Sequence, residues 1–163
     1  MPAAVHLERW SAEDHPLLIA LNGDPAQMAH VGGAESAEKI AERQARYVAD
    51  PGQFRIVDDA GGEAAGWVGF WTRTWRGETV YEIGWSVLPA FQRRGIATAA
   101  TALAVDEARQ ARAAEVVHAF PGVDNAASNA VCRRVGFELV DPALAFEYPP
   151  GTTMVVNDWR LAL

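Results

Sequence analysis

The clearest pattern of hydrophobic and polar positions lies in the middle of the chain. Over Thr79–Leu88, Tyr81 and Ile83 share one face of an extended segment, whereas Glu82 lies on the other face. A period of two residues is typical of a β-strand with one buried face. This segment and two before it are bounded by turn residues, and together they predict three strands in hairpin order, Phe54–Asp58, Ala64–Trp75 and Thr79–Leu88.

Helical spacing and capping residues predict helices before and after these strands. Ser36 is a good N-cap, and Gly136 stands where a left-handed C-cap residue belongs. The predicted helices run from Ala12 or Glu13 to Leu21, from after Ser36 to Ala49, over Ile96–Ala111 and over Ala126–Val135. Further strands are predicted at Val5–Trp10, at Val116–Phe120, at either Phe137–Val140 or Ala145–Tyr148, and at Thr153–Leu161. This order predicts an α/β (mixed α+β) fold, with one mixed sheet of about seven strands and helices on both faces.

Composition narrows the class of protein. The chain has 163 residues, of which 50% are hydrophobic, and a net charge of −7, which fits one globular domain over 1–163. An acidic chain repels phosphate backbones, so a nucleic-acid partner is disfavoured. Cys132 is the only cysteine, which excludes an intramolecular disulfide and a thiolate metal cluster. The histidines lack metal-ligand spacing, and we expect no bound metal.

The sequence also bears on location. The first residues show no basic stretch followed by an apolar run, so no signal peptide is predicted. The longest weakly polar stretch, Ile96–Val105, is too short and too rich in Ala and Thr to span a bilayer. We therefore expect a cytoplasmic protein without a membrane partner.

A strand end, a short Arg/Gly loop and a helix start follow one another after Val87. Gly95 would let the backbone approach a ligand closely, and the free N–H groups of the next helix's first turn suit a phosphate. Arg93 and Arg94 add positive charge beside it. A plain strand-to-helix turn with two solvated arginines explains the same residues equally well. The loop lacks the Gly-Lys-Ser/Thr of a Walker loop and the further glycines of a dinucleotide fingerprint.

Two motifs in this sequence resemble those of the GNAT superfamily of N-acetyltransferases. Gln92-Arg93-Arg94-Gly95-Ile96-Ala97 resembles the pyrophosphate loop, and Asn125-Ala126-Ala127-Ser128, followed by Gly136-Phe137, resembles a second signature. The resemblance covers roughly Val80–Val140 and is strongest to the branch that contains ribosomal-protein N-terminal acetyltransferases and many small-molecule acetyltransferases. It implies a single GNAT-like domain, a mostly antiparallel sheet, and acetyl-CoA as co-substrate.

The resemblance also implies roles for individual residues. Val87 and Leu88 would pair through their backbone with the pantetheine arm, and an N–H near Val87 would bind the thioester carbonyl. Asn125 and Ser128 would contact the far side of the cofactor, near the pantetheine and sulfur. The residues implied to hold the pyrophosphate are Gln92, Arg93, Arg94, Gly95, Ile96, Ala97 and Thr98.

Acetyl transfer to an amine needs a base and a proton donor for the departing thiolate. We predict Glu82 as the general base, acting directly or through water; the competing interpretation is a surface or salt-bridged strand carboxylate. His118 is the second candidate, although a lone histidine on an apolar strand is more often a satisfied core residue. Cys132 occupies the position where many GNAT enzymes carry the acidic tyrosine. Ser128, one helical turn earlier, could contact the thiolate instead, or Asn125 and solvent could suffice.

Cys132 itself is expected to be a buried apolar thiol and not a nucleophile, because no base flanks it in the sequence.

Alternating aromatic residues lie on the predicted strand before Glu82. One face of this strand carries Trp67, Trp71 and Trp75 together with Gly69 and Arg73. The three rings are either part of the core or an aromatic wall that holds an amine. We predict core for Trp67 and leave the other two open. In this superfamily the loop at Gly23–Ala34 often shapes the acceptor pocket, which also draws attention to Tyr47.

The sequence thus predicts an N-acetyltransferase that transfers an acetyl group from acetyl-CoA to a primary amine by direct attack in a ternary complex. The amine belongs to a small molecule or a protein N-terminus. The alternative is a catalytically silent acyl-CoA-binding regulatory module, which the missing tyrosine favours and the retained motifs oppose. An unrelated nucleotide-binding domain is disfavoured by the single loop glycine. The oligomeric state is left open, with a homodimer as one option because dimers are common among similar proteins.

Overall fold

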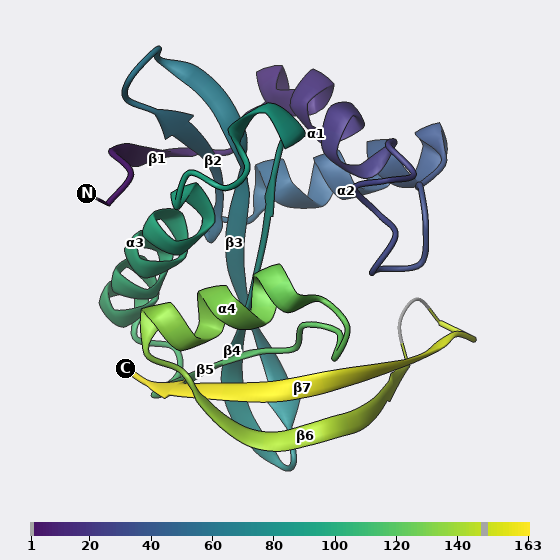
Figure 1. Cartoon of the computed structure of the whole chain (residues 1–163), viewed down its shortest axis with the longest axis vertical. Coiled ribbons are helices and arrows are strands. Elements are labelled where there is room, and N and C mark those ends of the chain that lie inside the picture. The colour runs from purple at the N-terminus through teal and green to yellow at the C-terminus, as the bar shows by residue number, and fades with distance from the viewer. Residues whose placement is uncertain (1, 148–149) are drawn as a thin grey trace.

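The computed structural model describes residues 2–147 and 150–163 and contains one seven-stranded sheet. The strands lie in the order β1-β2-β3-β4-β5-β7-β6 (Figure 1). Only β4 and β5 are parallel, and every other neighbouring pair is antiparallel. The mixed, mostly antiparallel sheet is therefore confirmed. The strands are β1 Val5–Arg9, β2 Gln53–Asp58, β3 Glu63–Trp75, β4 Glu78–Val87, β5 Val116–Ala119, β6 Glu138–Glu147 and β7 Thr153–Ala162.

Helices cover both faces of the sheet, as predicted (Figure 1). They are α1 His15–Asn22, α2 Ala37–Ala49, α3 Ile96–Ala111 and α4 Ala126–Val135. On one face α1 and α2 bury Leu18, Ile40 and Tyr47 against Trp10 and Trp67. The larger core lies on the other face, where the apolar side of α3 packs against the stripe of β4 that contains Tyr81 and Ile83. The period-two pattern in β4 thus separated the two faces correctly.

Two elements differ from their predicted form. The helix expected from Ala12 begins as a short 3-10 turn, Ala12–Asp14, and α1 starts only at His15. Pro16 in the first turn of α1 and the capping box between Ser11 and Asp14 explain this division, because both favour a new helix start. The two alternative strands after α4 form one strand, β6, with register shifts between Leu139 and Leu144; Tyr148 lies outside the described residues.

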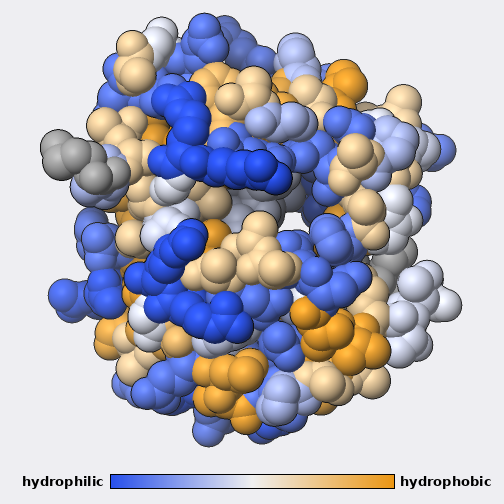
Figure 2. All heavy atoms as spheres, in the orientation of Figure 1, coloured by the Kyte–Doolittle hydropathy of each residue, from blue (hydrophilic) through white to orange (hydrophobic). Residues whose placement is uncertain are grey.

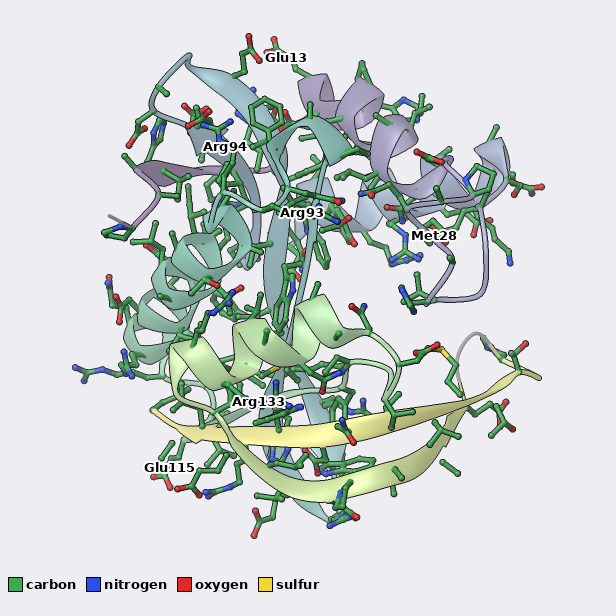
Figure 3. The ribbon with its side chains drawn as sticks, in the orientation of Figure 1. Glu13, Met28, Arg93, Arg94, Glu115 and Arg133 are labelled. Carbon is green, nitrogen blue, oxygen red and sulfur yellow. The ribbon has the colours of Figure 1, made fainter. Side chains whose placement is uncertain are left out.

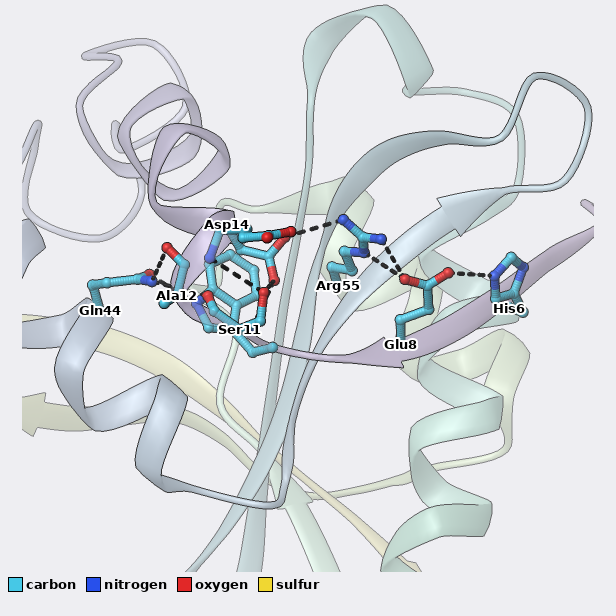
Figure 4. Close-up of polar contacts among 9 residues, drawn as sticks. His6, Glu8, Ser11, Ala12, Asp14, Gln44 and Arg55 are labelled. Carbon is cyan, nitrogen blue, oxygen red and sulfur yellow. Dashed lines mark hydrogen bonds and ion pairs between the residues drawn. The ribbon is translucent and has the colours of Figure 1, made fainter.

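A polar network joins β1 and β2 to the start of the helical layer (Figure 4). The Arg55 guanidinium binds Glu8 through Nε at 2.8 Å and the buried Asp14 through Nη1 at 3.3 Å. Arg55 holds the pKa of Glu8 below its usual range, because it hydrogen-bonds the carboxylate. Asp14 also accepts from the Ser11 backbone N–H at 2.7 Å, and Gln44 of α2 donates to the Ser11 carbonyl. These contacts fix α1 and α2 on the sheet.

Candidate active site

β4 and β5 separate immediately after Glu82. Their parallel pairing consists of Tyr81 with Val117 and Glu82 with His118, whereas β4 continues to Val87. Alternate residues of a strand direct their backbone groups to opposite neighbours. The Leu88 N–H donates to Ala65 of β3 at 2.8 Å, so the backbone groups of Val87 face the side that β5 has left. This geometry creates an open strand edge inside the sheet.

The molecular surface is hollowed beside this edge. Figure 2 shows a depression near the middle of this face, between the segment that leads into α3 and helix α4, with strongly hydrophilic side chains above and below it. Arg93 extends over the middle of the same face in Figure 3. An extended ligand could therefore lie along the open edge of β4.

The loop between β4 and α3 has the backbone geometry of an anion site. Arg93 and Gly95 both adopt left-handed conformations, with φ of 61° and 77°. Gly95 is the N-cap of α3 and supplies no side-chain cap, and the first helical bond runs from the Ala99 N–H to the Gly95 carbonyl. The N–H groups of the first turn therefore lack intrahelical acceptors and sit at the positive end of the helix dipole. Such N–H groups bind phosphate.

The two loop arginines have different environments. Arg94 forms an ion pair with Asp58 of β2 at 2.7 Å, and its guanidinium lies over the Phe91 ring at 5.5 Å. Arg93 is exposed, and in Figure 3 it points away from Arg94 toward the middle of the face. Asp58 partly neutralises the charge of Arg94, so Arg93 is the stronger candidate for a phosphate contact. Both residues remain predicted cofactor contacts.

The loop between α1 and α2 is hydrogen-bonded to the end of β4. Gln27 donates to the Val87 carbonyl at 2.8 Å, and Gln92 donates to the same carbonyl at 3.0 Å and to Gln27 at 2.9 Å. His30 of the same loop reaches Asp124, at the start of α4, at 3.4 Å. The loop that was predicted to shape the acceptor side therefore contacts both sides of the depression. Sequence reasoning missed Gln27, because nothing local distinguishes it from any loop glutamine.

Replacing Gln27 with leucine should loosen this loop without unfolding the domain. The substitution removes one amide from the Val87 carbonyl, and a single hydrogen bond contributes about 1 kcal/mol, or about five- to tenfold in a local equilibrium. We expect amide hydrogen exchange of residues 23–36 to rise by about that factor in mass spectrometry. Gln110→Leu, on the exposed side of α3, is the matched control and should leave the loop unchanged. Equal exchange in both variants would contradict the proposed role of Gln27.

Helix α4 begins at the second predicted motif. The Asn125 side chain accepts from the Ser128 N–H at 3.1 Å, which caps the helix. Ser128 is half-buried, whereas Cys132 is fully buried in the main core. Burial raises the pKa of the Cys132 thiol to about 12, so the expectation of an apolar thiol and not a nucleophile holds. The contacts of Asn125 and Ser128 with the cofactor stay predictions.

Asn129 anchors α4 to the rest of the domain. Its amide nitrogen donates to the carbonyls of Gly122 and Asn125 at 2.9 and 2.8 Å. Its oxygen accepts from Asn157 and from the Trp159 indole, each at 2.9 Å. Sequence reasoning missed this residue, although a polar side chain on the inward face of an amphipathic helix is a signal of such a network.

Asn129→Ala is expected to lower the free energy of unfolding by roughly 2 kcal/mol, because it removes the acceptor of the buried Trp159 indole N–H and one of the two donors to the Gly122 carbonyl. Urea denaturation measures this change. Asn157→Ala removes one contact of the same network at a half-buried position, and should cost about 1 kcal/mol or less. A loss from Asn129→Ala no larger than that from Asn157→Ala would contradict the anchoring role.

Glu82 lies where the parallel strands part. Arg73 of β3 donates to its carboxylate at 2.7 Å, and the side chain is 19% exposed. Burial raises the pKa of Glu82 above the usual carboxyl range; Arg73, a hydrogen bond from Trp71 and the nearby His118 oppose this rise without cancelling it. The carboxylate is thus salt-bridged, as the competing interpretation held, and also buried at the open edge. Both features suit a base held in one orientation.

Some aromatic side chains of β3 pack against the helices, and others lie near Glu82. Tyr47 of α2 stacks on Trp67 at 5.2 Å, and Trp67 stacks on Trp71 at 6.4 Å. The core role predicted for Trp67 is confirmed by its contacts with the α1–α2 layer. Gly84 lies beneath these rings, since an added Cβ would stand 3.1 Å from Trp67 and 3.4 Å from Trp71. The row of rings ends beside Glu82.

His118 is a buried histidine with a partner. Its Nδ1 lies 2.5 Å from the Oδ1 of Asp158 on β7, and its ring stacks on Phe120 at 5.8 Å. The Trp75 indole donates to the other oxygen of Asp158 at 3.1 Å. Asp158 could not be placed from the sequence, and the structure puts it directly behind His118.

Two cavities lie outside the open edge. One of about 240 Å³ is in the α1–α2 loop, lined by Met28, Val31, Glu35 and Lys39. A wider one of about 620 Å³ lies on the α3 face, between the C-terminal half of α3 and β3, with Phe70 in its lining. The loop before α3 borders neither cavity. The first adjoins the segment predicted to shape the acceptor pocket.

Comparison with known proteins decides the family. The model described as an acetyltransferase (GNAT) domain matches residues 5–138, which is most of the chain. The chain belongs to the GNAT acetyltransferase family. The match includes the loop before α3, Glu82 and the Asn125 motif, so the resemblance in both motifs is confirmed at the level of the family. No curated protein matches this GNAT chain.

Solved structures share the GNAT fold over nearly the whole chain. Spermidine N-acetyltransferase from Vibrio cholerae, in complex with CoA and spermine, is 18% identical with a TM-score of 0.77, covering 97% of this chain and 95% of that one. The Salmonella typhimurium protein yncA, with its cofactor acetyl-CoA, is 21% identical with a TM-score of 0.75 and coverage of 100% and 95%. Ribosomal-protein-alanine N-acetyltransferase from Brucella melitensis is 21% identical with a TM-score of 0.75 and coverage of 98% and 99%.

The described residues show neither a membrane-spanning helix nor a metal-binding cluster. No helix in the described ranges is long and apolar enough to cross a membrane. Among the same residues, no group of three or more His, Cys, Asp or Glu side chains could hold a metal ion.

Proposed function

We propose that this chain is an acetyl-CoA-dependent N-acetyltransferase that acts on a primary amine, with residues 1–163 as a single catalytic domain. One observation carries the proposal. The uncapped N-terminus of α3, with left-handed Arg93 and Gly95 before it, adjoins the open edge of β4, and that edge leads to the buried carboxylate of Glu82. A diphosphate site, an extended track and a base thus follow one another along one side of the sheet.

The residues present fit acetyl-CoA. The Gln92–Thr98 segment would hold the pyrophosphate on its backbone N–H groups, with Arg93 as counter-charge. The backbone of Val87 faces the open edge. Its carbonyl already accepts from Gln27 and Gln92, so an amide of the pantetheine arm would pair with it by displacing one of these side chains, and its N–H is left for the thioester carbonyl. The Leu88 N–H and carbonyl are already bonded to Ala65 and Phe91, so Leu88 would contribute mainly through its side chain. Asn125 and Ser128 would line the far side.

Acetyl-CoA supplies an activated acetyl thioester, and the chain's own residues manage the protons and the orientation. Glu82 removes a proton from the acceptor ammonium, which leaves a neutral amine with a lone pair. That amine attacks the carbonyl carbon directly, so a C–N bond forms and the C–S bond breaks. The nitrogen loses its second proton in the same reaction, and through solvent this proton replaces the one that is given to the thiolate. The Val87 N–H would donate to the carbonyl oxygen as negative charge develops there. The Ser128 hydroxyl is the candidate donor to the departing thiolate, since Cys132 is buried away from it.

The acceptor class is supported by charge as well as by the fold. The net charge of −7 favours a cationic amine and disfavours a nucleic acid. The neighbour from Vibrio cholerae holds spermine, and the one from Brucella melitensis is named for a protein substrate, so both a small-molecule amine and a protein N-terminus remain within the proposal. We further infer a cytoplasmic location and no membrane partner. A homodimer is compatible with the fold.

A turnover screen tests the proposal. Acetyl-CoA is incubated with polyamines, amino sugars, amino acid derivatives and N-terminal peptides, and free thiol is measured. We expect release of thiol with at least one amine class and identification of the acetylated amine by mass spectrometry. Tight binding of acetyl-CoA without turnover across the screen would instead support the silent regulatory module. Absence of binding would overturn the cofactor site itself.

A further inference from the structure

A buried histidine–aspartate pair lies directly behind Glu82. His118 of β5 is 6% exposed and Asp158 of β7 is 0% exposed, and their side chains meet at 2.5 Å. The second oxygen of Asp158 accepts from the Trp75 indole at 3.1 Å. Both oxygens of the buried carboxylate therefore have partners, and the Nδ1 of His118 is committed to Asp158.

The order of the strands determines which ring nitrogen of His118 faces Glu82. β5 lies between β4 and β7 in the sheet, and Glu82 and His118 are register partners across the parallel pair. The two nitrogens of an imidazole ring point to opposite sides. Because Nδ1 is directed to Asp158 on β7, Nε2 lies on the β4 side, toward Glu82. Register partners on neighbouring strands carry their side chains on the same face of the sheet, so Glu82 and His118 are close enough to interact.

Side chains from three other strands surround the His118 ring. β3 contributes Trp75 and Arg73, and β4 contributes Glu82. β7 contributes Asp158 and also Arg160, which is the register partner of His118. The two carboxylates flank the imidazole, whereas Arg73 is paired with Glu82 and Arg160 is exposed. Stacking on Phe120 covers the ring and limits access of water. Asp158 holds the ring in one orientation through Nδ1.

We propose that His118 is a second proton acceptor, which takes over the proton that Glu82 removes from the acceptor amine, while Asp158 positions its ring. The inference rests on the proposed function. In the first step the amine N–H bond breaks and an O–H bond forms on Glu82. In the second step that O–H bond breaks and an N–H bond forms on the Nε2 of His118, directly or through one water. Glu82 is thereby ionised again. As product leaves, the imidazolium returns its proton to Glu82, whose side chain is 19% exposed, and from there the proton passes to solvent.

His118→Asn is the decisive variant, since the asparagine amide can still donate to Asp158 but carries no second ring nitrogen. We expect kcat to fall about tenfold, because His118 acts through Glu82, while acetyl-CoA affinity stays within about twofold. The inflection of kcat/KM against pH in the range where histidine titrates should disappear. Asp158→Asn should lower kcat to a lesser extent with unchanged KM. His6→Asn, at an exposed position of β1, is the control and should match the wild-type profile.

A second measurement does not depend on turnover. In NMR, Glu82→Gln should move the titration curve of the His118 ring protons to lower pH, because it removes a neighbouring negative charge. Glu78→Gln, at the exposed start of the same strand, should leave the curve in place. A curve that is insensitive to Glu82→Gln, or wild-type kcat and pH profile in His118→Asn, would overturn the inference and leave the proposed function standing. Failure of the wild-type protein to acetylate any amine is the separate failure of the proposed function.

Discussion

Glu82→Gln is expected to lower kcat about 10³-fold while acetyl-CoA affinity stays within about twofold. Glutamine has nearly the shape of glutamate and can still accept a hydrogen bond from Arg73, which pairs with Glu82 at 2.7 Å. It cannot remove a proton from an ammonium ion. The loss therefore falls on the chemical step and not on binding of acetyl-CoA, whose proposed contacts lie further along β4. Steady-state kinetics with the amine found in the screen and calorimetric titration of acetyl-CoA separate the two effects.

The pH dependence of the wild-type enzyme follows from the same carboxylate. Burial raises the pKa of Glu82, and a base acts only when it is deprotonated. Activity should therefore be present above the raised pKa and be lost as the pH falls through it, at a higher pH than an ordinary carboxyl group would give. Glu78→Gln is the matched control on the same strand and should keep the wild-type profile. A Glu82→Gln enzyme with wild-type turnover at every pH would remove Glu82 from the mechanism.

Local patterns in the sequence were sufficient for the elements that carry the site. The ranges of α3 and α4 agree with the prediction at both ends. Gly95 marks the start of α3 and Gly136 marks the end of α4, so one boundary of each helix is encoded by a glycine. The alternation in β4 placed Glu82 on the face opposite Tyr81. Such signals depend on a few neighbouring residues, and they survive folding because tertiary contacts reinforce them.

The partners of each site residue could not be found in this way. Arg73 and Glu82 meet because β3 and β4 form a hairpin in one particular register, and His118 and Asp158 meet because β7 inserts between β5 and β6. Trp75 and Asp158 are 83 positions apart in the chain. No short-range pattern encodes such pairs. The salt-bridged state of Glu82, the buried state of His118 and the link from Gln27 to Val87 are therefore properties of the assembled sheet.

These pairs also explain why single residues were ambiguous. The sequence leaves Glu82 as either a base or a structural carboxylate, and its environment combines burial, one guanidinium and an open strand edge. It leaves His118 as either a base or a core histidine, and His118 is buried with its Nδ1 bonded. In both cases the packing that satisfies the group also fixes its orientation toward the site, so a structural partner and a role in the reaction do not exclude each other.

Gly95→Val is expected to weaken acetyl-CoA binding by about 10²-fold. Gly95 has φ of 77°, a conformation that costs a residue with a Cβ about 1–2 kcal/mol and a β-branched residue more. Among the described residues, no atom lies within 4 Å of an added Cβ, so the strain comes from the backbone and not from a clash with these residues. A relaxed loop would turn away the N–H groups at the start of α3. About 2.7 kcal/mol of lost binding corresponds to the expected factor.

Gly77→Val is the control that separates strain from binding. Gly77, in the turn between β3 and β4, has φ of 83° and likewise no atom within 4 Å of an added Cβ. Both variants should lose a similar free energy of unfolding, more than about 1–2 kcal/mol in urea denaturation, because both force a β-branched side chain into the same region of φ. Only Gly95→Val should lose affinity in calorimetric titration, since only Gly95 precedes the N-terminus of α3. Equal affinities in the two folded variants would mean that the diphosphate is held elsewhere, because the backbone at the start of α3 could then be distorted without consequence for binding.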